Sequence, residues 1–201
     1  YKWGLNPKPH VISLASIDSL SEITPTQIGA MVRLHELTIN FEIHPLIKKA
    51  ASTVASTLIR RSGTIGGNLC LDTRCFWYNQ TELWRRSLDW CHKCDEGTGA
   101  DCRVIAGQNE TCVATYQGDL APCLMVLDAS LILVGATGSR EVPITEFFEL
   151  DGITRNVLKS HEFIASIKIP SISYDWIGAY EKLRLRETWD FPEAGVAVAV
   201  N

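Results

Sequence analysis

Four cysteines carry the clearest chemical signal in this chain: Cys75, Cys91, Cys102 and Cys112. Four thiolates are the usual ligand set of a [4Fe–4S] cluster and also of a structural zinc ion. Zinc sites often pair two C-x2-C motifs, whereas here only Cys91 and Cys94 form such a pair. The wide spacing of the four cysteines fits a loop wrapped around a group larger than a single metal ion. The residues alone leave a cluster, zinc, and disulfides or unligated thiols open.

A glycine-rich segment, Thr64-Ile65-Gly66-Gly67-Asn68, lies shortly before the cysteines. Paired glycines let the backbone approach a phosphate closely and direct its N–H groups at the ligand. The same five residues would also make an ordinary turn. A phosphate-binding turn beside a thiol cluster would outline an electron-transfer protein.

Three polar residues have both a structural and a functional interpretation. Asp119 is positioned to cap a helix or to contact a ligand. Lys182 is expected to be a solvated strand residue unless a cofactor lies beside it. His92 is expected to be a solvated loop residue.

Composition and charge exclude several classes of protein. The chain has 201 residues, a hydrophobic fraction of 46% and a net charge of −4, so we expect a globular protein without a basic surface for nucleic acid. No apolar run approaches the roughly 18 residues that cross a bilayer. An odd number of cysteines, seven, argues against a secreted disulfide fold. We therefore expect a cytoplasmic protein that binds neither nucleic acid nor membrane.

Apolar periodicity predicts an α+β fold, with helices early and strands late. A strand is expected over 28–34, a helix over 44–58, and a second helix from Leu120 to Leu127 that Asp119 would cap. No core pattern is visible over 71–118, which is long for a loop unless something holds it in place. The later strands are expected over 130–134, 140–144, 162–169, 176–183 and 195–200, with Pro143 marking an edge or a strand end.

Several segments together resemble a known family. Residues 64–68, Gly118-Asp119-Leu-Ala-Pro122, Leu124-Met-Val-Leu-Asp128 and Ile164-Ala-Ser-Ile-Lys-Ile-Pro170 resemble the flavoprotein part of molybdenum hydroxylases, a group that includes xanthine dehydrogenase and carbon monoxide dehydrogenase. In most members the Gly-Gly-Asn segment leads almost directly into the aspartate segment, but here some fifty residues intervene. That insertion, with Leu71-Asp-Thr-Arg-Cys75 followed by Phe-Trp-Tyr-Asn-Gln80, resembles the β subunit of 4-hydroxybenzoyl-CoA reductases, which carries a [4Fe–4S] cluster in such a loop.

The resemblance implies a domain organisation. Residues 1–170 would be an FAD-binding domain of the vanillyl-alcohol-oxidase/PCMH type, without its amino-terminal lobe and with an iron–sulfur insertion at about 71–118. Residues 171–201 would begin a truncated C-terminal α/β domain. The chain would then be a fragment of the subunit, and the amino-terminal glycine turn that also contacts the flavin in this family is absent from it.

The resemblance also implies cofactors and their ligands. Cys75, Cys91, Cys102 and Cys112 would hold the cluster, with Cys94 extra to the pattern and Cys70 and Cys123 as core thiols. Ile164 and Lys182 match positions near the flavin ring, where an amine would stabilise the reduced, anionic flavin. The full set of expected FAD-binding positions is Thr64, Ile65, Gly66, Gly67, Asn68, Gly118, Asp119, Ile164 and Lys182. No catalytic residue is expected on this chain.

The implied function is electron relay within a molybdenum enzyme. The expected partners are a molybdopterin-containing large subunit, a [2Fe–2S] small subunit and a ferredoxin-like electron donor. The implied overall reaction is reductive dehydroxylation of 4-hydroxybenzoyl-CoA. The alternatives are a zinc-stabilised, non-redox interaction module and a flavin subunit of another molybdenum dehydrogenase.

Overall fold

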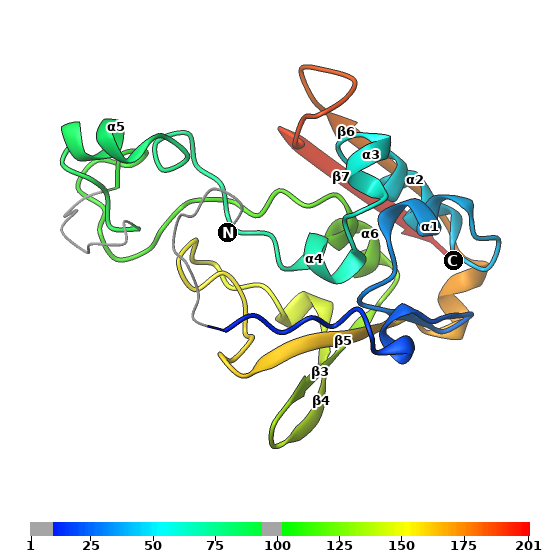
Figure 1. Ribbon diagram of the computed structural model, residues 1–201. Coiled ribbons are helices and arrows are strands. Elements are labelled where there is room, and N and C mark those ends of the chain that lie inside the picture. The colour runs from blue at the N-terminus through cyan, green and yellow to red at the C-terminus, as the bar shows by residue number, and fades with distance from the viewer. Residues whose placement is uncertain (1–9, 94–101) are drawn as a thin grey trace.

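The computed structural model describes residues 10–93 and 102–201 (Figure 1). Cys94, the extra cysteine of the predicted pattern, lies outside these residues. The described chain forms a five-stranded antiparallel sheet covered by short helices, a separate two-stranded sheet, and a long irregular excursion between α4 and α6. No helix in the described ranges has the length and apolar character needed to cross a bilayer.

The main sheet has the strand order β1-β2-β5-β3-β4. Its strands are β1 (Ile23–Thr24), β2 (Gln27–Gly29), β5 (Glu162–Lys168), β3 (Ser130–Gly135) and β4 (Gly138–Pro143). Leu131 pairs with Ile167, and both side chains are fully buried. The edge strand β4 ends at Pro143 as predicted, because proline has no N–H to donate to a neighbouring strand.

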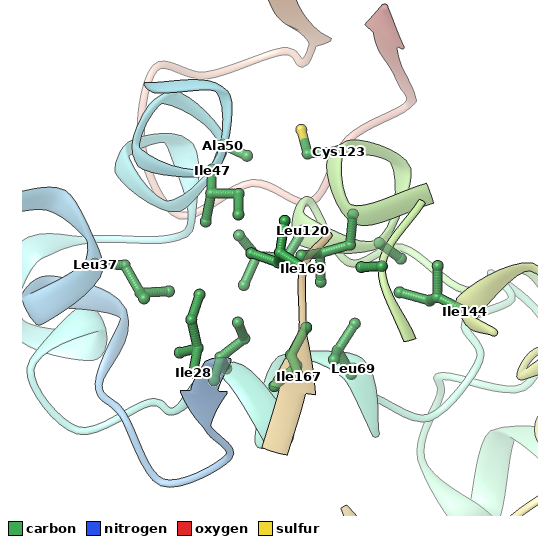
Figure 2. Packing of buried hydrophobic residues seen from close by; sticks show 14 of the residues in the cluster. Ile28, Leu37, Ile47, Ala50, Leu69, Leu120, Cys123, Ile144, Ile167 and Ile169 are labelled. Atoms are coloured by element: carbon green, nitrogen blue, oxygen red, sulfur yellow. The ribbon is translucent and has the colours of Figure 1, made fainter. Parts of the chain in front are cut away.

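Four helices supply the other side of the core: α1 (Leu34–Ile39), α2 (Pro45–Thr53), α4 (Ile65–Leu69) and α6 (Leu120–Val126). A fifth helix, α3 (Thr57–Arg60), follows α2 and has no buried residue. Figure 2 shows Ile28 and Ile167 of the sheet meeting Leu37, Ile47 and Leu120 from the helices. Short 3-10 turns at Asp18–Ser21, Ile144–Glu146 and Ser171–Asp175 connect the elements. The core brings α4 and the start of α6 together although some fifty residues separate them.

Two sequence predictions about these elements were wrong in extent. The strand expected over 28–34 ends at Gly29, where the Leu20 carbonyl lies so close that no side chain would fit. The helix expected over 44–58 ends at Thr53, because Ala55 adopts a left-handed backbone with φ 41° and Ser56 caps a new helix, α3. Apolar spacing continues across the break and therefore did not reveal it.

The glycine-rich segment is a short helix rather than a turn. Thr64 is its N-cap: the hydroxyl oxygen accepts a hydrogen bond from the Gly67 N–H at 3.1 Å. A Cβ added at Gly66 would lie 2.8 Å from the Cβ of Ala30, so this glycine allows α4 to pack tightly beside the sheet. Asp119 precedes α6 but makes no capping hydrogen bond, which corrects that prediction.

The described parts of the insertion, residues 71–93 and 102–118, extend away from this body (Figure 1). Its one helix in the described part, α5 (Glu82–Ser87), was not predicted, and Thr81 caps it. The two arms of the insertion meet at an antiparallel bridge between Arg74 and Thr115. The described part of the insertion contributes no buried residue to the main hydrophobic core.

Residues beyond the main sheet form a second, two-stranded antiparallel sheet of β6 (Ile177–Leu183) and β7 (Ala194–Val200). These strands agree closely with the predicted ranges. Tyr180 of β6 is buried in the same core as α2 and α6. The hairpin is therefore held beside the helices, and its connecting loop reaches the site described next.

Candidate functional site

A cavity of about 520 Å³ opens between the helices and the β6–β7 loop. Its walls are mainly apolar, with a few polar groups at one side. The lining residues are Leu34, Val54, Ala55, Ile59, Gly63, Thr64, Gly67, Asn68, Leu71, Gln117, Asp119, Trp189, Asp190 and Phe191. This size and lining are typical of a pocket for an organic cofactor.

Four of the predicted FAD-binding residues meet at this cavity: Thr64, Gly67, Asn68 and Asp119. Asn68 is 6% exposed, and its side-chain oxygen has no hydrogen-bond partner among the described residues. Buried polar atoms of this kind usually have a partner, so the position calls for a ligand or water donor. A Cβ added at Gly67 would meet only the Thr64 hydroxyl, so a side chain there would face the cavity side rather than the core.

Five predicted positions do not line the cavity. Ile65 and Ile164 are core residues, and Ile164 pairs across the sheet with Leu133. Gly66 packs against Ala30, Gly118 packs against the Tyr116 side chain, and Lys182 lies behind the cavity wall. Any role of these residues toward a cofactor would therefore pass through their neighbours.

Lys182 is buried, contrary to the expectation of a solvated strand residue. Its ammonium nitrogen lies 3.0 Å from Asp119 Oδ1, and the two side chains are only 2% and 4% exposed. Lys182 also donates to the Thr53 and Asp190 carbonyls, while Tyr180 donates its hydroxyl to Asp119 at 2.8 Å. Burial, followed by the Asp119 carboxylate, raises the pKa of Tyr180 far above its ordinary value. This network joins α2, α6 and the β6–β7 hairpin beneath the cavity.

The aromatic rim of the cavity was missed by sequence reasoning. Trp189 and Phe191 belong to the β6–β7 loop, which is held against Ala55: the Trp189 N–H and the Thr188 hydroxyl both donate to the Ala55 carbonyl. Trp189 itself has a left-handed backbone, with φ 64°. The available signal was an aromatic-rich run between two predicted strands, but nothing in the sequence places that run beside residues 54–64.

The four predicted cluster ligands line a second, smaller cavity, inside the insertion. Cys102 and Cys112 are each 7% exposed, whereas Cys75 and Cys91 are half-buried. His92 also lines this cavity, and its Nδ1 has no partner in the described part of the chain, which corrects the expectation of a solvated residue. All six described cysteines are free thiols, which argues against disulfides among them.

Backbone donors point at two of these sulfurs. Val104 and Ile105 N–H groups lie 3.4 Å from Cys102 Sγ, and the Ala114 N–H lies 3.5 Å from Cys112 Sγ. Burial is the main cause that raises the pKa of Cys112 above the ordinary thiol value. No set of three or more His, Cys, Asp or Glu side chains in residues 10–93 and 102–201 is arranged around one metal ion. The thiols share one cavity without converging on a single point.

Arg74 connects the two cavities. Its guanidinium carbon lies 4.3 Å from the centre of the Phe191 ring, which forms part of the larger cavity's wall. Arg74 directly precedes Cys75, and its backbone exchanges hydrogen bonds with Thr115 at 2.8 and 3.0 Å. The thiol cavity is thus linked to the larger cavity by Arg74, in addition to Leu71 and Gln117 of the insertion, which line the larger cavity directly.

The fold presents a cavity with the size and lining for an organic cofactor, and comparison with known proteins gives the family. Residues 2–172 match the family of the FAD binding domain in molybdopterin dehydrogenase, so the chain belongs to that family. It is 26% identical over 189 residues to the aldehyde oxidoreductase FAD-binding subunit PaoB of Escherichia coli (strain K12), covering 87% of this chain and 57% of that protein. It is 25% identical over 200 residues to the carbon monoxide dehydrogenase medium chain of Hydrogenophaga pseudoflava, covering 96% and 54%.

Solved structures give the same fold. Carbon monoxide dehydrogenase from Hydrogenophaga pseudoflava matches with a TM-score of 0.63 and 24% identity over 91% of this chain and 50% of that one. Quinoline 2-oxidoreductase from Pseudomonas putida 86 matches with a TM-score of 0.62 and 17% identity over 92% and 50%. The predicted α+β FAD-binding fold is confirmed. The chain spans about half the length of these relatives. None of the relatives named here is a 4-hydroxybenzoyl-CoA reductase, so the comparisons do not support that finer assignment.

Proposed function

We propose that this chain is the FAD-binding part of an electron-transfer subunit of a molybdenum hydroxylase-type dehydrogenase, with a [4Fe–4S] cluster in its insertion. One observation carries the proposal: four cysteines that are far apart in sequence line one cavity, and that cavity is joined by Arg74 to the cofactor cavity of an FAD-binding family.

The larger cavity has the groups that FAD requires. Leu34, Val54 and Ile59 offer apolar walls for a flat ring, with Trp189 and Phe191 at the rim. The unpartnered amide oxygen of Asn68 would accept a hydrogen bond from the cofactor, and Gly67 leaves room for it. Asp119 is held by Lys182 and Tyr180, so its orientation is fixed before the cofactor binds. FAD, when bound there, would supply electron transfer in single steps or in pairs.

The thiol cavity suits a cluster better than one zinc ion. A zinc site needs four donors about 2.3 Å from a single point, and the described donors do not converge in that way. A cluster takes one thiolate for each iron, so its thiolates lie farther apart. The N–H groups directed at Cys102 and Cys112 are of the kind that tunes cluster potentials, and such a cluster would supply one-electron transfer.

The partners and substrate follow from the family and from the insertion. A molybdopterin-containing large subunit, a [2Fe–2S] small subunit and a ferredoxin-like donor would complete the enzyme. Resemblance of the insertion favours 4-hydroxybenzoyl-CoA as the substrate of the whole enzyme. The second candidate is a flavin subunit of another molybdenum dehydrogenase, which is favoured by similarity to the aldehyde oxidoreductase and carbon monoxide dehydrogenase subunits. Turnover of the assembled enzyme with 4-hydroxybenzoyl-CoA, against an aldehyde, separates the two.

Replacement of single cysteines tests the cluster. In the intact subunit purified without oxygen, Cys112→Ser should remove the cluster's visible absorbance and its iron while FAD remains bound. Cys70→Ala is the matched control, because Cys70 is a free thiol outside the cavity. Full iron and sulfide in Cys112→Ser would show that the ligand assignment is wrong.

Replacement of Gly67 tests the flavin site. Gly67→Val should abolish FAD binding yet leave the fold intact, because the new Cβ meets only the Thr64 hydroxyl. Ser62→Val is the control, at an exposed position outside the cavity lining. If a folded Gly67→Val protein retained one FAD per subunit, FAD would not bind beside α4.

A further inference from the structure

The thiol cavity has an asymmetric charge. Lys93 and Arg103 line it, and none of its lining residues is a carboxylate; the carboxylate of Asp151, outside the lining, accepts a hydrogen bond from the Cys112 N–H at 3.0 Å. We propose that Lys93 sets the reduction potential of the cluster, raising it by placing a fixed positive charge beside the four thiolates. This inference rests on the proposed function, because it requires the cluster.

Lys93 is buried and held in one position. Its side chain is 7% exposed. The ammonium group donates to Thr73 Oγ1 at 2.6 Å, to the Thr73 carbonyl at 3.1 Å and to Asp72 Oδ1 at 3.1 Å, and it lies 4.8 Å from the Tyr78 ring centre. Thr73 is itself 5% exposed and donates its hydroxyl to the Gly152 carbonyl at 2.5 Å. These contacts hold the ammonium in place at the cavity wall.

The contacts also show how Lys93 would act. An ammonium has three N–H donors, and here Asp72 and Thr73 take them, so Lys93 acts through its charge and not by a hydrogen bond to sulfur. Asp72 is 59% exposed and therefore strongly screened by water, and Arg155 lies 3.6 Å from the same oxygen. The positive charge facing the cavity is thus only partly offset.

Electrostatics fixes the sign of the effect. Reduction adds one electron, taken from an external one-electron donor, to a four-thiolate cluster that is already anionic, and no proton is needed. A nearby buried cation lowers the free energy of the reduced form more than that of the oxidised form, since charges interact strongly away from water. The potential therefore rises, as net charge near a cluster is one of its main determinants.

Arg103 provides an exposed positive charge at the same cavity, with which the buried charge of Lys93 can be compared. It also lines the cavity, but its side chain is exposed and its guanidinium donates to the Trp90 and Leu88 carbonyls. Water screens an exposed charge much more than a buried one. Removal of Arg103 should therefore shift the potential less than removal of Lys93.

The test is an anaerobic redox titration of the intact subunit, followed by electron paramagnetic resonance of the reduced cluster. Lys93→Met should shift the midpoint potential downward by at least a tenfold change in the reduction equilibrium, about 59 mV for one electron. Lys93→Arg keeps the positive charge and should leave the potential close to that of the unmodified subunit. Arg103→Met should shift the potential downward by less than Lys93→Met does. An unchanged potential in a Lys93→Met subunit with full iron and sulfide would overturn the inference.

A second variant covers the case in which Lys93→Met loses its cluster. Asp72→Asn keeps the ammonium and removes its exposed anionic partner, so the potential should move upward, by less than the Lys93→Met shift because water screens Asp72. A downward shift would contradict the inference. Iron and sulfide in the unmodified subunit are measured first: their absence would refute the proposed cluster itself, whereas a normal cluster with unresponsive potentials would refute only the role of Lys93.

Discussion

The body of the molecule and its insertion are stabilised by different means. In the body, sheet and helices share one apolar core that includes Leu37, Leu124 and Ile167. In the insertion, the described buried side chains are mainly Thr73, Cys102, Cys112 and Ala114, while Phe76, Leu83 and Val104 remain exposed. The body can fold by burying apolar surface. The insertion has little such surface to bury, so we expect its order to depend on what its thiols bind.

The largest effect is expected in the body, at the buried ion pair. Lys182→Met leaves Asp119 without its charged partner, which should lower the free energy of unfolding by about 3–5 kcal/mol. Lys168→Met is the control: its pair with Glu141 is about half exposed and should contribute less than about 1 kcal/mol. Urea unfolding measures both. Equal losses in the two variants would mean that the Asp119–Lys182 pair does not anchor the hairpin.

Leucine truncation compares the two regions directly. Leu124→Ala, at a fully buried position of α6, should cost about 2–5 kcal/mol because it leaves a cavity. Leu83→Ala, at a position 79% exposed in α5, should change stability by no more than about 0.5 kcal/mol. Thermal unfolding distinguishes the two. A large cost for Leu83→Ala would show that the insertion has an apolar core of its own.

A third variant tests how the insertion is tied to the body. Asp151 accepts hydrogen bonds from the N–H groups of Cys112, Ile153 and Thr154, at 3.0, 3.1 and 3.2 Å. Asp151→Asn weakens these charge-assisted bonds, so iron should be lost to a chelator roughly tenfold faster while unfolding of the body changes little. Asp128→Asn, at an exposed position, is the matched control. Identical iron-loss rates in Asp151→Asn and Asp128→Asn would show that Asp151 does not hold Cys112 in place.

The smallest effect is a pH dependence confined to the sheet. Hydrogen bonds from Arg140 lower the pKa of Glu162 to about 2, below its usual value of roughly 4.3. A carboxyl whose pKa is lowered on folding contributes stability above its unfolded pKa and loses it as pH falls toward the folded pKa. The melting temperature should therefore fall between about pH 4.5 and pH 2, and Glu162→Gln should flatten that fall. Parallel curves for both proteins would exclude this pair as a cause.

Much of the fold could be predicted because local patterns and burial agree. The late strands alternate or carry β-branched residues, and their observed bounds lie within a residue or two of the predicted ones. The break between α2 and α3 could not be predicted, because it depends on a left-handed Ala55 whose carbonyl accepts hydrogen bonds from Thr188 and from Trp189, a loop far along the chain. Long-range contacts of this kind leave no trace in local spacing.

The candidate site was predictable to a similar degree. Residue types indicated the four cysteines and the Thr64–Asn68 segment, and the four cysteines line one cavity while Thr64, Gly67 and Asn68 line the other. The burial of Lys182 was not predictable, because one strand's alternation cannot reveal that Asp119 lies beside it. The roles of Trp189 and Lys93 likewise depend on partners distant in sequence or on burial in a region without an apolar pattern.

Metal and sulfide analysis of the intact subunit, purified without oxygen, tests the central claim most directly. If Cys75, Cys91, Cys102 and Cys112 hold a cluster beside the flavin cavity, the protein should contain about four irons and about four acid-labile sulfides for each FAD. The same preparation of Cys112→Ser should contain FAD but little iron. One zinc per chain without sulfide, or FAD with neither metal nor sulfide, would contradict the account.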